Sequence, residues 1–130
     1  MSIGVIGLGI MGSAIADHVV KAGYRVVGYD VRAARMRGLN AATGVAAATA
    51  ADVARQSPIV ITSLPSSEAL AQTVEALAEA ARPRQIVIEA STLPIELKQR
   101  ARMKLRKYGV ELLDCPISGT GAQATAEVGY

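Results

Sequence analysis

Short apolar runs alternate with longer stretches of helical periodicity along the whole chain. The runs are rich in valine and isoleucine, a composition typical of strands buried on both faces of a parallel sheet. We expect six such strands, at Ile3–Ile6, Arg25–Tyr29, about Val45, Pro58–Leu64, Gln85–Glu89 and Val110–Asp114.

Helices are expected between consecutive strands, because the intervening segments place apolar residues at helical spacing. In the fourth of them, Ser66 or Ser67 can cap the N-terminus, and Leu70, Val74 and Leu77 should face inward. The five predicted helices cover Ile10–Ala22, Val31–Asn40, Ala50–Gln56, Ser66–Ala81 and Pro94–Tyr108.

This alternation predicts an α/β fold with one Rossmann-type doubly wound parallel sheet. Right-handed crossovers give the expected strand order 3-2-1-4-5-6. Ligands of such sheets bind beyond the carboxyl ends of the strands. The unusual residues of this chain follow those ends: Gly7–Gly12, Asp30, Ser63–Pro65, Ser91–Thr92 and Pro116–Gly119.

The segment GLGIMG, residues 7–12, has the GxGxxG spacing between the first strand and the first helix. Gly7 permits backbone angles closed to other residues, Gly9 lets a pyrophosphate approach the main chain, and Gly12 lets the helix pack on the strand. The helix N-terminus then faces an anion. We expect a dinucleotide to contact Gly7, Leu8, Gly9, Ile10, Met11 and Gly12.

Asp30 follows the second strand, close to the position expected for the acidic residue that binds the adenosine ribose. Its carboxylate can accept hydrogen bonds from both ribose hydroxyls but would repel a 2′-phosphate. The expected cofactor is therefore NAD, with NADP disfavoured, although Arg32 and Arg35 could partly neutralise a phosphate. The alternative is a simple glycine turn followed by a solvent-exposed aspartate.

A length of 130 residues corresponds to one domain, and its single cysteine, Cys115, excludes an intramolecular disulfide. The sequence shows neither a signal peptide nor a membrane-spanning stretch, so we expect a cytoplasmic location and no membrane partner. We expect Cys115 to be a buried, inert thiol and His18 to lie on the outer surface of the first helix.

Six lysines and arginines within residues 98–107 account for the net charge of +3. Leu97, Ala101, Leu105 and Tyr108 fall at helical spacing, which predicts an amphipathic helix with those residues on the sheet and a solvated cationic face. RNA binding by this face is the alternative, and it predicts retention on polyanions at physiological salt. No aromatic residue is interleaved for base stacking, so we expect no nucleic-acid partner.

Five segments together resemble the β-hydroxyacid dehydrogenase family, which includes 3-hydroxyisobutyrate, tartronate semialdehyde and 6-phosphogluconate dehydrogenases. They are GLGIMG, AGYRVVGYD, ITSLP, EASTLP and LDCPISG. The resemblance implies the NAD-binding domain of an oxidoreductase that transfers hydride between NAD and a small β-hydroxy acid. It further implies that Leu64, Pro65 and Thr92 line the nicotinamide half of the site.

The last segment resembles the substrate signature of the family, which implies that Ser118, Gly119 and Thr120 hold the substrate carboxylate. A hydroxyl and two backbone amides are suitable neutral donors for such a group. Thr120 stands where the family often has a second glycine, which leaves the substrate open. A plain turn is the alternative for these residues.

Members of the family are more than twice this long and carry the catalytic lysine in a helical second domain. We therefore expect residues 1–130 to be an NAD(P)-binding domain truncated at its C-terminal end, with no catalytic residue, no metal site and no turnover alone. A homo-oligomer is compatible with the sequence. Two alternatives are a complete, non-catalytic nucleotide-sensing module and the domain of an NADP-dependent phosphogluconate- or imine-type reductase.

Overall fold

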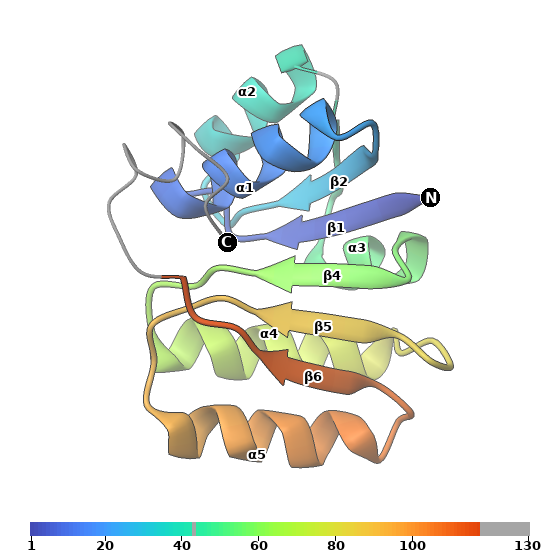
Figure 1. Ribbon diagram of the computed structural model, residues 1–130, viewed down its shortest axis with the longest axis vertical. Helices are drawn as coiled ribbons and strands as arrows, with labels where there is room; N and C mark the ends of the chain where they lie inside the picture. The colour runs from blue at the N-terminus through green and yellow to red at the C-terminus, as the bar shows by residue number, and fades with distance from the viewer. Residues whose placement is uncertain (43, 118–130) are drawn as a thin grey trace.

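A computed structural model describes residues 1–42 and 44–117, which form one twisted sheet flanked by helices (Figure 1). All strand pairs are parallel, and the order β3-β2-β1-β4-β5-β6 is the expected one. The strands are β1 Ser2–Ile6, β2 Arg25–Tyr29, β3 Val45–Ala46, β4 Ile59–Thr62, β5 Ile86–Glu89 and β6 Glu111–Asp114. The helices are α1 Ile10–Lys21, α2 Ala33–Ala42, α3 Ala50–Gln56, α4 Ser67–Glu79 and α5 Ile95–Arg106.

Each face of the sheet has its own core. The larger core joins the strands to α3, α4 and α5, and its fully or nearly fully buried strand residues are Ile6, Val27, Val60, Val87 and Leu112. The smaller core lies under α1 and α2, where Val5 and Val26 pack. Alternate residues of one strand therefore serve opposite cores, as expected for a sheet covered on both sides.

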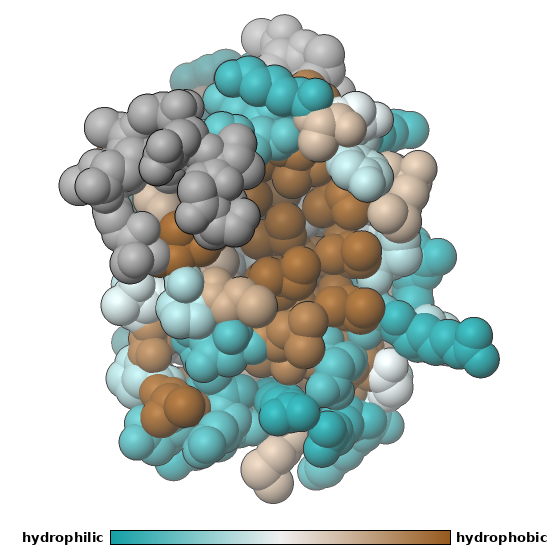
Figure 2. Space-filling view, in the orientation of Figure 1, coloured by the Kyte–Doolittle hydropathy of each residue, from teal (hydrophilic) through white to brown (hydrophobic). Residues whose placement is uncertain are grey.

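The face that carries α1 and α2 is covered over only part of its width. Figure 2 shows an apolar area on this face, over β4 and β5. Ile15 and Val19 of α1 line a hollow there with Ile61 of β4 and Ile88 of β5. Among the described residues, no helix lies over this area (Figure 1). None of the described helices is long and apolar enough to cross a membrane.

Most helix boundaries agree with the sequence pattern, and α3 covers the expected residues. Ser66, one of the two predicted caps, accepts a hydrogen bond from the amide of Ala69 at the start of α4. One strand boundary was wrong. The strand β4 ends at Thr62, before the loop residues Ser63 and Leu64.

The amphipathic prediction for α5 is confirmed at Ala101 and Leu105, which are buried, but it was wrong at two residues. Lys98 lies three residues before Ala101 and seven before Leu105, so it shares their buried face, and only 3% of it is exposed. Tyr108, expected on the sheet, follows the last turn of the helix and is 51% exposed. Two glutamates offset part of the cationic face, because Arg102 and Arg106 share Glu111 and Lys104 pairs with Glu75.

Two single-residue predictions also fail. Cys115 is exposed, not buried, because it follows β6 at the sheet edge and borders the uncovered apolar area. His18 is half-buried, because it lies on the side of α1 that lines the same hollow. Both Cys115 and His18 therefore line the hollow over β4 and β5.

Candidate functional site

The glycine loop connects β1 to α1, and two of its glycines, Gly7 and Gly12, leave no room for a side chain. Gly7 has φ = 94°, and a Cβ there would lie 2.0 Å from the carbonyl oxygen of Ser63. A Cβ at Gly12 would lie 1.8 Å from the carbonyl oxygen of Gly7. Positive φ and these close approaches both require glycine, which confirms the two structural roles predicted for these positions.

Gly9 differs, because the space where its side chain would be is open. The nearest atom to an added Cβ, at 3.6 Å, is the guanidinium Nη1 of Arg35. Gly9 is the N-cap of α1 and provides no side-chain cap, and the first turn contains no acidic residue. The first amides and the positive end of the helix dipole are therefore available to an anion. This arrangement fits the pyrophosphate of a dinucleotide.

Asp30 follows β2 and is only 5% exposed. Its Oδ2 accepts a hydrogen bond from the amide of Leu8 in the glycine loop at 2.7 Å, and its Oδ1 accepts one from the amide of Arg32 at 2.8 Å. Burial alone would raise the pKa of Asp30, but these amides and the guanidinium of Arg35 outweigh it and hold the pKa below its ordinary value. Asp30 is therefore an anion at neutral pH, fixed to the loop.

Arg35 competes for the same carboxylate. Its Nη1 lies 3.4 Å from Oδ2 of Asp30, and the side chain is 38% exposed. A carboxylate offers about four acceptor positions, and donors from the described residues occupy three of them. About one acceptor position is therefore left on Asp30, and a further donor at Oδ2 would require Arg35 to move away.

The other predicted residues of the loop are placed differently from one another. The side chain of Leu8 is 3% exposed and packs in the smaller core, so only its backbone is near the candidate site. Met11 is half-buried, whereas Ile10 is 76% exposed beside the open amides of the helix. Backbone groups, more than side chains, therefore shape this half of the site.

The loops after β4 and β5 lie side by side at the same edge of the sheet as the glycine loop. The amide of Ser63 donates to the carbonyl of Ile6 at 2.9 Å, and the amide of Ala90 donates to the carbonyl of Thr62 at 2.8 Å. Ser91 Oγ accepts a hydrogen bond from the amide of Leu64 at 2.7 Å. The structure thus brings together the loops that carry the predicted nicotinamide residues.

Those residues face the solvent to different degrees. Leu64 is half-buried and contacts the larger core, while Pro65 and Thr92 are exposed at the mouth of the two loops. The predicted carboxylate-binding residues Ser118, Gly119 and Thr120 lie outside the described residues. Between residues 1 and 117, leaving out residue 43, no group of three or more His, Cys, Asp or Glu side chains could hold a metal ion.

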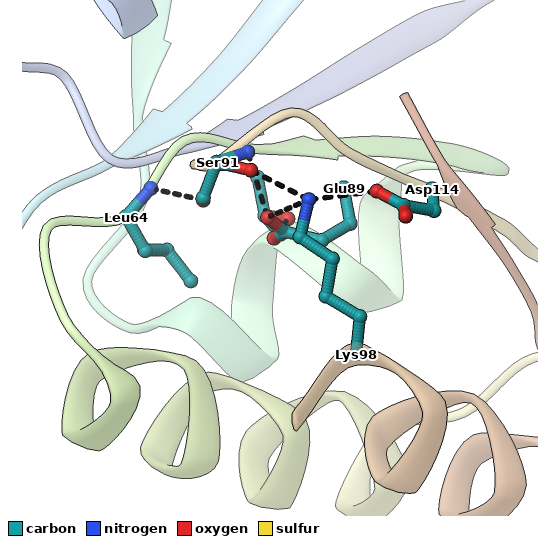
Figure 3. A network of polar contacts seen from close by, with 6 residues as sticks. Leu64, Glu89, Ser91, Lys98 and Asp114 are labelled. Atoms are coloured by element: carbon teal, nitrogen blue, oxygen red, sulfur yellow. Dashed lines mark hydrogen bonds and ion pairs between the residues drawn. The ribbon is translucent and has the colours of Figure 1, made fainter. Parts of the chain in front are cut away.

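A buried polar network beneath these loops was not predicted. Glu89, with no exposed surface, accepts hydrogen bonds from Thr62 and from the amide of Ser91, and Lys98 reaches it from α5 (Figure 3). One signal was available in the sequence. Lys98 has the helical spacing of Ala101 and Leu105, which marks a lysine on an apolar face.

Comparison with known proteins agrees with this geometry. A family model described as the NAD binding domain of 6-phosphogluconate dehydrogenase matches residues 2–128. The chain is 35% identical over 127 residues to the NAD-dependent L-serine dehydrogenase of Pseudomonas aeruginosa, covering 95% of this chain and 43% of that protein. It is 31% identical over 128 residues to the L-threonate dehydrogenase of Cupriavidus necator, covering 96% of this chain and 43% of the relative.

One solved structure is similar to this chain in both fold and sequence. It is the 3-hydroxyisobutyrate dehydrogenase of Mycobacterium tuberculosis with L-serine, with a TM-score of 0.90 and 31% identity over 96% of this chain and 43% of that one. The chain thus spans less than half the length of these relatives. The match over residues 2–128 shows that the chain belongs to the family of NAD-binding domains typified by that of 6-phosphogluconate dehydrogenase, a domain shared with the 3-hydroxyisobutyrate dehydrogenases.

Proposed function

We propose that the edge formed by the glycine loop, Asp30 and the loops after β4 and β5 holds NAD across the sheet. The observation that carries this proposal is the buried anion of Asp30, bonded to the Leu8 amide next to the uncapped start of α1. The pyrophosphate would lie at Gly9 and the adenosine ribose at Asp30. The nicotinamide half would then lie at Leu64, Pro65 and Thr92.

In this arrangement the chain binds and orients the cofactor, and bound NAD supplies the acceptor for a hydride. The amides of the first turn of α1 neutralise the pyrophosphate, while the carboxylate of Asp30 fixes the ribose. The bond between Leu64 and Ser91 holds the two loops on which the ring would rest. No described side chain is assigned the proton transfer that oxidation of a hydroxyl also requires.

For the whole protein we propose oxidation of a small hydroxy acid with NAD. Three comparison proteins support this class, because their names specify L-serine, L-threonate and 3-hydroxyisobutyrate dehydrogenation. The substrate carboxylate would bind at Ser118, Gly119 and Thr120. The catalytic lysine would come from outside residues 1–130, so the isolated chain should bind NAD without turnover.

Calorimetric titration with NADH and with NADPH at one ionic strength tests the cofactor site. We expect tighter binding of NADH, and loss of that preference in Asp30→Asn, which removes the charge with little change in shape. Glu111→Gln is the matched control, because Glu111 begins β6 at the opposite edge of the sheet. Equal binding of both cofactors by the parent chain, or an unchanged preference in Asp30→Asn, would contradict the assignment.

A further inference from the structure

The last core-facing position of each of the three strands β4, β5 and β6 is polar. Thr62, Glu89 and Asp114 occupy neighbouring register positions across these strands. Each lies two residues after a buried aliphatic residue, so each points to the face covered by α4 and α5. The core of that face therefore ends in a polar row directly beneath the loops of the proposed nicotinamide half.

Lys98 of α5 closes this row from the helix side. Its ammonium donates to the carbonyl oxygen of Ser91 at 2.5 Å and to Oδ1 of Asp114 at 2.7 Å, and it lies 3.9 Å from Oε1 of Glu89 (Figure 3). One cation thus contacts the end of β5, the end of β6 and the loop after β5. These contacts fix the positions of the two strand ends relative to each other.

Ser91 is held by all three of its polar groups. Its amide donates to Oε1 of Glu89 at 2.7 Å, its carbonyl accepts from Lys98, and its hydroxyl accepts from the amide of Leu64. Ser91 is 3% exposed, whereas the next residue, Thr92, is exposed. The network therefore determines where Thr92 and Leu64 emerge at the surface.

We propose that Lys98 is a positioning residue for the nicotinamide half of the cofactor site, acting through Ser91. This inference rests on the proposed function, because it concerns the shape of the same site. An apolar residue at position 98 would pack beside Ala101 and Leu105 without the cost of burying a charge. The ammonium contacts the last residues of β5 and β6 and the loop after β5, all at the carboxyl ends of the strands, where a role in positioning that loop requires them.

The test compares two ligands that share the adenosine half. ADP-ribose lacks the nicotinamide ring, so it reports on Asp30 and the glycine loop alone, whereas NADH also reports on the loops after β4 and β5. In Lys98→Met we expect the NADH affinity to fall about tenfold, roughly 1.4 kcal/mol, and the ADP-ribose affinity to stay nearly constant. Lys104→Met is the matched control, because Lys104 lies on the same helix and pairs with Glu75 at the surface. It should change neither affinity.

Asp114→Asn provides a second variant that keeps the buried lysine and its contacts with Ser91 and Glu89. It should lower the NADH affinity in the same direction by a smaller factor, again without affecting ADP-ribose. This variant decides the question if circular dichroism shows that Lys98→Met is unfolded.

Equal losses for NADH and ADP-ribose, or no loss of NADH binding in the folded variants, would overturn the role of Lys98. Failure of the parent chain to bind either ligand would instead overturn the proposed cofactor site. A parent chain that binds ADP-ribose and NADH with the same affinity would show that the nicotinamide loops add nothing, and this result also overturns the inference.

Discussion

The pair formed by Glu89 and Lys98 should couple strongly in folding, because both side chains are almost completely buried. Lys98→Met removes the ammonium and leaves a carboxylate without its cation, 0% exposed. Glu89→Gln removes the charge on the other side, where Lys98 keeps its bond to Asp114. The double variant removes both charges and leaves neither uncompensated.

The separation of 3.9 Å between Nζ and Oε1 sets the size of the effect. At an effective dielectric constant of about 20 it corresponds to an attraction of about 4 kcal/mol, which the cost of desolvation largely offsets. Loss of one partner of a buried pair costs about 3–5 kcal/mol. The hydrogen bonds that Glu89 keeps, from Thr62 and Ser91, place Lys98→Met near the lower end.

Urea unfolding of the four chains of this cycle measures the coupling. With a slope of about 1–3 kcal/mol per M, Lys98→Met should lower the midpoint by about 1–3 M. The double variant should lose about 1–3 kcal/mol less than the sum of the single losses. Additive losses, within about 0.5 kcal/mol, would show that the two charges do not compensate each other.

Three further predictions concern the cofactor half of the domain. In isothermal titration, Arg35→Gln should lower the ratio of NADPH to NADH affinity about fivefold, because the cation beside Asp30 is lost. Arg37→Gln, on the same helix, is the control. An unchanged ratio in Arg35→Gln would exclude a role of Arg35 in discriminating between the two cofactors. In urea unfolding, Gly12→Ala should cost about 3 kcal/mol or more, because the added Cβ would meet the carbonyl of Gly7. Gly38→Ala should instead stabilise α2 by about 0.5–1 kcal/mol, because no atom lies within 4 Å of the added Cβ. Similar effects of the two substitutions would contradict the packing described. The pKa of Asp30 is lowered in the folded chain, so the stabilisation from its carboxylate is present above the ordinary pKa near 3.8 and is lost as the pH falls through the folded pKa. Asp30→Asn should therefore flatten the dependence of the unfolding free energy on pH below about pH 4. An unchanged slope would argue against the bonds from Leu8 and Arg32.

The sheet could be predicted from the sequence because its strands are short apolar runs separated by clear helical periods. Both structural glycines and the place of Asp30 followed from the same pattern, since a turn with positive φ and a tight helix crossing leave few choices of residue. The contact between Arg35 and Asp30 could not be predicted, because it depends on how α2 packs. This contact limits how many further hydrogen bonds Asp30 could accept, including those from a ribose.

Lys98 shows where a pattern of charges misleads. Within a run of six cations it was assigned to the solvated face, although its spacing from Ala101 and Leu105 places it on the core side. Its partners Glu89 and Asp114 end β5 and β6, and Ser91 lies in the loop after β5, so the register of these two strands is needed to bring them to it. The prediction that Cys115 is buried was wrong for a related reason, because its exposure depends on how much of the sheet face is covered.

Titration of the ¹⁵N-labelled chain with NADH, followed through backbone amide resonances, tests directly whether the cofactor binds at the carboxyl edge of the sheet. We expect shifts in the amides of Leu8 to Met11, of Arg32 beside Asp30, and of Leu64 and Thr92 in the opposite loops. ADP-ribose should reproduce the first two groups and leave Leu64 and Thr92 unchanged. Shifts confined to the cationic surface of α5, or to the apolar area over β4 and β5, would contradict a cofactor site at the carboxyl edge of the sheet.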